Sequence, residues 1–235
     1  RFAMDYLTKF IRRAGYTENF TGMFTPALFI PSGGLITCTG TEADACAAND
    51  PVDARGDRLS IPFMTSTTQV SRSCTGTRVG GPAGGLNPSP FPGERNLVNV
   101  FWVSGTATNP KELRCQTYSR DINNWLDNPV SIINNVEAME LQVGVSRIDT
   151  ERYTARYVSV DTVINEALIA NVRSIRIAIL TTSQDSLNTN KIQTNKKERV
   201  YALLDAPQMT FTDGSLRNIF STTVELPNSI ETAGQ

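Results

Sequence analysis

Two pairs of acidic residues are the first candidates for chemistry in this sequence. Glu137 lies close to Glu140, and Asp149 lies close to Glu151. Two carboxyl groups are all that glycoside hydrolysis requires. The chain contains no histidine, which excludes Ser/His/Asp hydrolysis, Cys/His chemistry and HExxH zinc sites. Neighbouring acids most often form a solvated surface, so we interpret both pairs as ordinary charges and expect no catalytic residue and no enzyme.

Four cysteines provide the second kind of reactive side chain, at Cys38, Cys46, Cys74 and Cys115. No CxxC motif occurs, and without histidine a zinc site has few ligands, so we expect no metal and no cofactor. An even number of cysteines favours disulfides in an oxidising compartment. Three pairings are possible, and the spacing favours Cys38 with Cys46 and Cys74 with Cys115.

The charge balance argues against recruitment of polyanions. Lys and Arg number 22 and Asp and Glu number 23, a net charge of -1. We therefore predict no nucleic-acid partner. The longest apolar run, residues 175–180, is interrupted by Arg176 and is far shorter than the roughly 20 residues that cross a bilayer.

The first element expected to position other residues is an amphipathic helix over residues 2–14. Its apolar side chains recur at helical spacing, and Gly15 follows at the place where a left-handed C-cap is favoured. No Ser, Thr, Asp or Asn marks its start, so we expect the helix to continue upstream of residue 1.

The remainder of the sequence is typical of β-strands separated by Pro, Gly and Asn. Strands are expected where apolar residues alternate around 59–63, in the apolar run 97–103, and at 139–145, 153–160 and 172–181. Asp161 is the expected N-cap of a short helix over 161–170. Asp213-Gly214 predicts a hairpin between 208–212 and 215–226. Residues 183–199 are polar and are expected to be a solvated connection, and the Gly/Pro-rich residues 80–93 a subdomain seam.

Several segments, in order along the chain, resemble the PilW-type minor pilins of bacterial type IV pili. Residues 2–16 are similar to that family's helix-to-loop junction, Cys74 and Cys115 to its paired cysteines, and residues 136–145 to its Val-Glu-x-Met strand. Residues 172–177 resemble a later apolar strand of that family, and residues 213–224 resemble its C-terminal sequence motif. Val143 stands where the family usually has Tyr. The alternative interpretation is therefore that the chain is a PilX-like or GspJ-like relative.

The resemblance implies an α+β fold in which a pilin-like N-terminal helix packs on a largely antiparallel sheet, with an enlarged, disulfide-stapled β-rich body. Residues 1–15 would be the C-terminal half of the pilin helix, and residues 16–235 the head. The implied role is that of a minor pilin that helps to initiate pilus assembly and lies at or near the tip, in pili used for twitching motility or adhesion. Its partners would be other minor pilins, the major pilin and a large tip adhesin, and a missing helix segment would anchor it in the inner membrane with a periplasmic head.

The same resemblance assigns two faces to the helix. One face would pack on the sheet through Leu7, Phe10, Ile11 and Ala14. The other would meet neighbouring subunits through Phe2, Tyr6, Lys9 and Arg13.

Three other functions remain open at this point. A type II secretion pseudopilin would have the same architecture. A glycosidase requires two converging carboxyl groups, at least one of them with a raised pKa. An adhesin module requires Phe91, Trp102 and Trp125 to form one exposed patch, although the run around Trp102 favours a core position.

Overall fold

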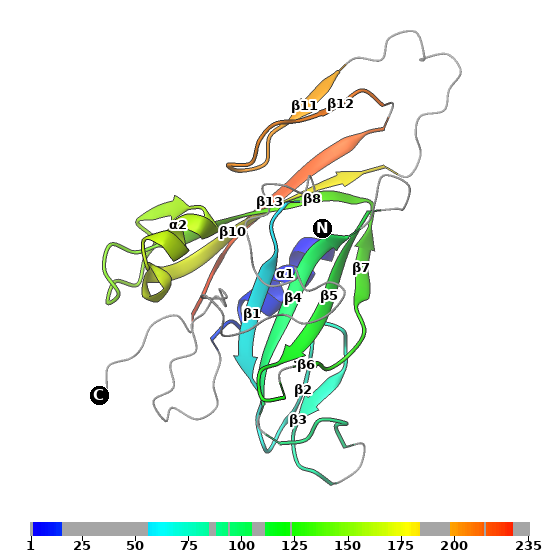
Figure 1. The fold of residues 1–235 in the computed structure, drawn as a ribbon, viewed down its shortest axis with the longest axis vertical. Coiled ribbons are helices and arrows are strands. Elements are labelled where there is room, and N and C mark those ends of the chain that lie inside the picture. The colour runs from blue at the N-terminus through cyan, green and yellow to red at the C-terminus, as the bar shows by residue number, and fades with distance from the viewer. Residues whose placement is uncertain are drawn as a thin grey trace.

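The chain forms one N-terminal helix and a set of antiparallel sheets in a computed structural model (Figure 1). The structure describes residues 2–15, 56–84, 88–93, 95–104, 111–122, 124–183, 198–213 and 215–227, with only the backbone of Ile164. Cys38 and Cys46, and the pairing predicted for them, lie outside these ranges. The predicted α+β class is confirmed for the described part of the chain.

The helices are α1 (Phe2–Ile11) and α2 (Val160–Asn165), with a 3-10 turn at Ile169–Asn171. The strands are β1 (Leu59–Met64), β2 (Val70–Arg72), β3 (Arg78–Gly80), β4 (Asn96–Ser104), β5 (Glu112–Ser119), β6 (Asn124–Trp125), β7 (Val130–Asn134), β8 (Val136–Val145), β9 (Arg156–Val158), β10 (Val172–Thr182), β11 (Arg199–Tyr201), β12 (Met209–Phe211) and β13 (Arg217–Glu225).

Helix α1 ends three residues before the predicted boundary. The amides of Arg13 and Ala14 donate to the carbonyls of Phe10 and Ile11, which are i to i-3 bonds that tighten the last turn. Gly15 then takes the predicted left-handed conformation, with φ +71°, and its amide donates to the carbonyl of Pro62 in β1. The glycine therefore both stops the helix and fixes it to a strand.

A four-stranded antiparallel sheet has the order β13-β10-β8-β9. The prediction that residues 172–181 form a central strand is confirmed, because β10 lies between β13 and β8. One face of β10 carries Ile175, Ile177 and Ile179, which are buried in the main core. The other face carries Ala178 and Leu180, which pack with Leu203.

A five-stranded sheet contains β1, β4, β5 and β6 in that order, with β7 also paired to β5. Strand β4 is buried on both faces, as its continuous apolar run predicts. Trp102 is 5% exposed, which confirms its expected core position. Strand β1 differs from the expected half-exposed strand, because its residues on both faces are almost all buried.

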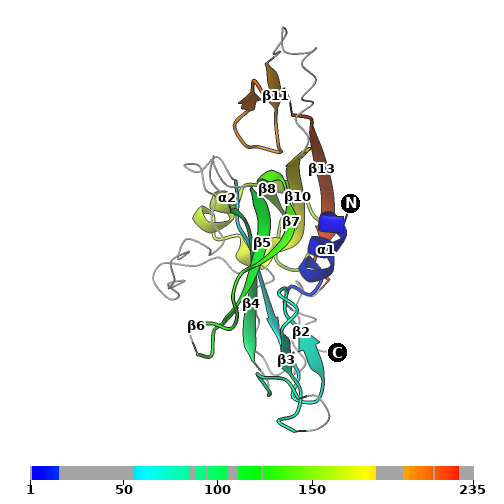
Figure 2. The ribbon, with the colours of Figure 1, turned by 90° about the vertical axis from the view of Figure 1, so that its right-hand side faces the viewer.

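The two sheets and α1 enclose one core. Side chains of α1, β1, β4, β5, β8, β10 and β13 all belong to the same buried cluster. In both ribbon views α1 lies beside β13, with which it is in contact (Figures 1 and 2). Burial of this helix face, rather than intrinsic helix propensity, therefore holds ten residues in an α-helix.

The hairpin predicted around Asp213 is wrong. Strand β12 pairs with β11, and β13 pairs with β10 over nine consecutive residue pairs. Val224 of β13 belongs to the main core, whereas Phe211 of β12 packs with Leu203 on the other face of the four-stranded sheet. The two runs therefore bury their apolar residues in different clusters, and this tertiary packing overrides the local turn signal.

Two boundaries near the second helix also differ from the predictions. Helix α2 begins at Val160, and Ser159 is its N-cap, since the Ser159 hydroxyl accepts a hydrogen bond from the amide of Thr162 at 3.2 Å. Asp161 therefore lies inside the first turn. The strand predicted over 153–160 is confined to Arg156–Val158.

Candidate functional site

An aromatic row runs along α1 from its exposed end into the core. The ring centroids of Phe2 and Tyr6 are 5.8 Å apart, and those of Tyr6 and Phe10 are 5.0 Å apart. Phe10 in turn lies 5.8 Å from Phe101 of β4. The spacing of four residues brings these rings onto one helix face, one turn apart. The row therefore connects the exposed Phe2 to the centre of the five-stranded sheet.

The residues predicted to face the sheet are buried. Leu7, Ile11 and Ala14 have no exposed surface, and Phe10 is 3% exposed. Their cluster contains residues of both sheets. The helix is thus fixed on the head by its apolar stripe.

Two of the four predicted partner-facing residues turn their polar groups towards the chain's own body. The Tyr6 hydroxyl donates to the carbonyl of Cys74, and desolvation on burial raises the Tyr6 pKa well above its ordinary value. The Arg13 guanidinium donates to the carbonyl of Arg72 at 2.9 Å and lies 4.6 Å from the ring centroid of Phe63. Both side chains therefore fix the helix to the β1 and β2 region.

The other two predicted partner-facing residues lie on the outer surface. Phe2 is 62% exposed, and Lys9 is also exposed. An exposed phenylalanine and a lysine two turns further along the outer face of a docked helix suit packing against a surface with apolar and polar parts.

Cys74 and Cys115 lie close together in the core, both as thiols. Cys115 belongs to β5, and Cys74 lies in the turn between β2 and β3. Burial raises the pKa of the Cys74 thiol, and its contact with Cys115 raises that pKa further. The fold therefore brings this predicted pair together, and the bond between them stays a prediction.

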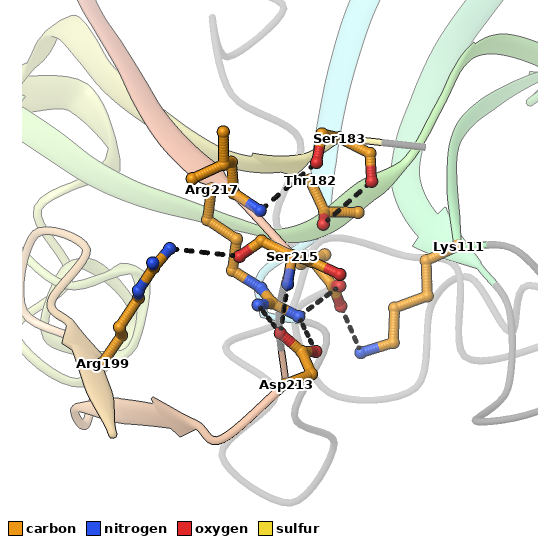
Figure 3. A network of polar contacts seen from close by, with 9 residues as sticks. Lys111, Thr182, Ser183, Arg199, Asp213, Ser215 and Arg217 are labelled. Atoms are coloured by element: carbon orange, nitrogen blue, oxygen red, sulfur yellow. Dashed lines mark hydrogen bonds and ion pairs between the residues drawn. The ribbon is translucent and has the colours of Figure 1, made fainter. Parts of the chain in front are cut away.

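A polar cluster that the sequence analysis missed surrounds Arg217 at the start of β13 (Figure 3). The Arg217 guanidinium, whose side chain is 3% exposed, forms two 2.6 Å bonds to the carboxylate of Asp213. It also lies 3.2 Å from Glu137 of β8 and 3.6 Å from the ring centroid of Phe211. Glu137 in turn pairs with Lys111 at 3.0 Å. This cluster joins β8, β12 and β13 to the start of β5.

The electrostatics of this cluster follow from the buried guanidinium. Its hydrogen bonds to Asp213 hold the pKa of that carboxyl below its ordinary value and raise the pKa of Arg217. Asp213 and Arg217 are four residues apart, which is a weak sequence signal. Nothing in the local sequence indicates Glu137 as the third partner, because β8 reaches β13 only across β10.

The acidic pairs considered for catalysis are rearranged by the fold. Glu137 pairs with Arg217 and Lys111, whereas Glu140 lies against Asp57. Burial raises the pKa of Glu140 to about 8 and that of Asp57 to about 6, and each carboxyl lies near the other. Asp57 also accepts a 2.8 Å hydrogen bond from the amide of Leu141. The two carboxyl groups share a hydrogen bond, which places them closer together than the roughly 5 to 9 Å that a glycosidase requires, and Asp57 is 3% exposed. We therefore interpret the pair as a contact that binds residue 57 to β8.

The aromatics required for an adhesin patch do not gather. Trp102 and the half-buried Trp125 pack in one cluster, with Val98 and Tyr118. Phe91 packs in another, with Phe63 and Val79. Within the described residues, no three His, Cys, Asp or Glu side chains are grouped so as to hold a metal ion. Among the helices that the structure describes, none is long and apolar enough to span a membrane.

In the described part of the chain, helix α1 buries one face in the head and exposes Phe2 and Lys9 on the other. A helix with one face buried in a core between antiparallel sheets places the described residues in the class of α+β domains. The family model of PilW, described as type IV pilus-assembly protein W, matches residues 100–228, which is more than half of the chain. The chain belongs to the PilW family.

Structural comparison gives a weaker likeness. A type IV-like pilin from Thermus thermophilus is similar at 15% sequence identity and a TM-score of 0.37, with 76% of this chain and 81% of that chain covered. No curated protein matches the sequence.

Proposed function

We propose that this chain is a minor pilin, a non-catalytic subunit that helps to initiate assembly of a type IV pilus and stays at or near its tip. The observation that carries this proposal is the PilW family match over residues 100–228. The arrangement of α1 supports it, because a helix that buries one face in its own head leaves the opposite face available to a neighbouring subunit.

The proposed contact surface is the outer face of α1. Phe2 and Lys9 are its exposed members. Tyr6 and Arg13 support this surface indirectly, because their hydrogen bonds to the carbonyls of Cys74 and Arg72 hold the helix on the head. Other minor pilins and the major pilin are the proposed partners, and a large tip adhesin is a further one.

The proposed location is the bacterial cell envelope and then the extracellular pilus. An apolar helix segment upstream of residue 1 would anchor the subunit in the inner membrane, with the head in the periplasm. The four cysteines suit that compartment, since the periplasm permits disulfides.

Deletion of the gene, followed by complementation, tests the proposal. We expect the deletion strain to show few surface pili by electron microscopy, and the wild-type gene to restore them. Mass spectrometry of sheared, purified pili should detect the chain at far lower abundance than the major pilin. Normal pili in the deletion strain, together with a defect in protein secretion, would contradict the proposal in favour of the pseudopilin interpretation.

A matched pair of variants separates the contact role of α1 from folding. Phe2→Ala, at 62% exposure on α1, should reduce the pilus count several-fold. Tyr153→Ala, at 69% exposure on the loop before β9, should leave the count unchanged. Neither change removes a buried group, so both variants should keep wild-type thermal stability. Equal pilus counts for the two variants would exclude Phe2 from the subunit contact.

A further inference from the structure

The outer edge of β13 is a long strand edge without a partner among the described residues. β13 is the first strand in the order β13-β10-β8-β9, and it is nine residues long. Its register with β10 runs without interruption from Arg217 to Glu225, whereas the pairing of β10 with β8 contains two irregularities. The pairing of β13 is therefore regular, without a bulge that would prevent the addition of a further strand.

The hydrogen-bond pattern shows which residues face outward. The amide of Leu226 donates to Arg173, and the amide of Ser183 donates to Leu216, each at 2.8 Å. In an antiparallel pair such bonded positions recur every second residue, so the even-numbered residues of β13 bond to β10. The backbone groups of Ile219, Ser221 and Thr223 consequently point away from the sheet. No hydrogen bond within the described residues satisfies them.

Two other edges of the main sheets are short or blocked, and the β7 edge, at five residues, is shorter than β13. Strand β9, at the opposite edge of the same sheet, has three residues. Strand β1, at one edge of the five-stranded sheet, carries Pro62, which has no amide hydrogen, and its carbonyl already accepts from Gly15. Natural proteins protect long edges with charges, prolines or bulges. From Asn218 to Val224, β13 contains none of these.

The surface around this edge is apolar. Ile219 is 43% exposed on one face of the sheet, and Phe220 is 38% exposed on the other. The N-terminal end of α1, which carries the exposed Phe2, lies beside β13 in both ribbon views (Figures 1 and 2). An added strand would thus gain apolar contacts on both of its faces.

We propose that the outer edge of β13 binds an extended segment of a neighbouring pilus subunit as a fifth strand of this sheet. The unpaired N–H and C=O groups select an extended backbone, as in other cases of β-strand addition. Residues 218–224 are uncharged, so the bound segment is also uncharged over this length, because a charge placed there would lose water without gaining a partner. Its side chains that face Phe220 and Phe2 are apolar.

The direction of α1 argues for a different chain rather than a second copy. Helix α1 and β13 run in the same general direction (Figures 1 and 2). Two-fold antiparallel pairing of two β13 edges would make the two α1 helices antiparallel. Subunits that enter one fibre from one membrane share a helix direction, so this antiparallel pairing of two copies does not fit such a fibre. The identification of the partner as a neighbouring pilus subunit rests on the proposed function.

The test uses a synthetic peptide in which threonine and valine alternate, an uncharged extended strand that copies no segment of this chain, titrated into the isotope-labelled protein. We expect NMR shifts at the amides of Ile219, Ser221 and Thr223. Ser221→Pro removes one outward donor without removing a bond to β10 and should weaken binding at least tenfold. Ser221→Ala keeps that donor and should bind like the wild type. Ile219→Lys places a charge at the edge and should also weaken binding tenfold, which keeps the test valid if the proline variant does not fold.

Two results would overturn the proposal. One is peptide binding of equal strength to wild type and to Ile219→Lys. The other is the absence of amide shifts in β13 at millimolar peptide. Either result would leave the deletion phenotype and pilus composition unaffected, so the edge-strand proposal can fail while the minor-pilin proposal stands.

Discussion

Replacement of the buried Arg217 by methionine should destabilise the head strongly, because it removes the shared cation of the Arg217 cluster. The Arg217 side chain is 3% exposed, and the Glu137 side chain is 13% exposed. Loss of one partner of a buried ion pair costs about 3 to 5 kcal/mol. Asp213 is 49% exposed and can regain water, and Glu137 keeps Lys111 at 3.0 Å. We therefore expect Arg217→Met to lower the free energy of unfolding by about 3 kcal/mol, at the lower end of that range.

The matched control is Arg156→Met, which breaks an ion pair of the same type at the surface. Arg156 and Glu166 are 2.6 Å apart, and their side chains are 57% and 50% exposed. An exposed pair of this kind contributes no more than about 1 kcal/mol. The two variants thus compare similar contact distances at different depths of burial.

The assay is urea unfolding of each variant beside the wild type, with thermal unfolding as a second measurement. A loss of about 3 kcal/mol in a domain of this size corresponds to a Tm lower by roughly 6 to 12 °C. The slope of the urea transition should stay unchanged, since the native fold is retained. Equal stability of the Arg217→Met and Arg156→Met variants would refute the reasoning that burial gives this cluster its contribution.

Three further predictions concern the core. The raised pKa values of Asp57 and Glu140 mean that their contribution to stability is fully present below the ordinary carboxyl pKa and is lost as the pH rises through about 6 and about 8. Urea unfolding at pH 5 and pH 8.5 should show a smaller loss of stability for Glu140→Gln than for the wild type, and an equal loss would contradict this prediction. Non-reducing peptide mapping of protein from an oxidising compartment should find Cys74 linked to Cys115, with a contribution to stability of about 4 kcal/mol in the chain-entropy model; a Cys38 to Cys74 link would overturn this pairing. Tyr6→Phe should lower the free energy of unfolding by about 1 kcal/mol, because the carbonyl of Cys74 loses its donor; no change would show that water replaces the hydroxyl.

The sequence predicted those elements whose burial pattern is local. Helix α1 repeats its apolar residues every three or four positions, and Gly15 marks its end, so both were predictable. The doubly buried β4 and the central β10 were predictable from their continuous apolar runs. In these elements local propensity and tertiary packing agree.

The remainder depends on contacts between distant segments, which one sequence does not reveal. Asp213 was interpreted as part of a hairpin turn, but its carboxylate binds Arg217, which also contacts Glu137 eighty residues away. Glu140 was considered with Glu137 because they are neighbours in sequence, whereas its partner is Asp57. A pattern of single residues cannot indicate which strand edge stays unpaired, so the β13 edge also became visible only in the sheet order.

Photo-crosslinking in cells is the most direct test of the central claim that the outer face of α1 contacts other pilins. A photoreactive phenylalanine analogue is introduced at Phe2, which is 62% exposed, and at Tyr153, which is 69% exposed, as the matched control. The account predicts that irradiation links position 2, but not position 153, to another pilin identified by mass spectrometry. A chain that is present and folded but forms no pilin adduct from position 2 would contradict the account.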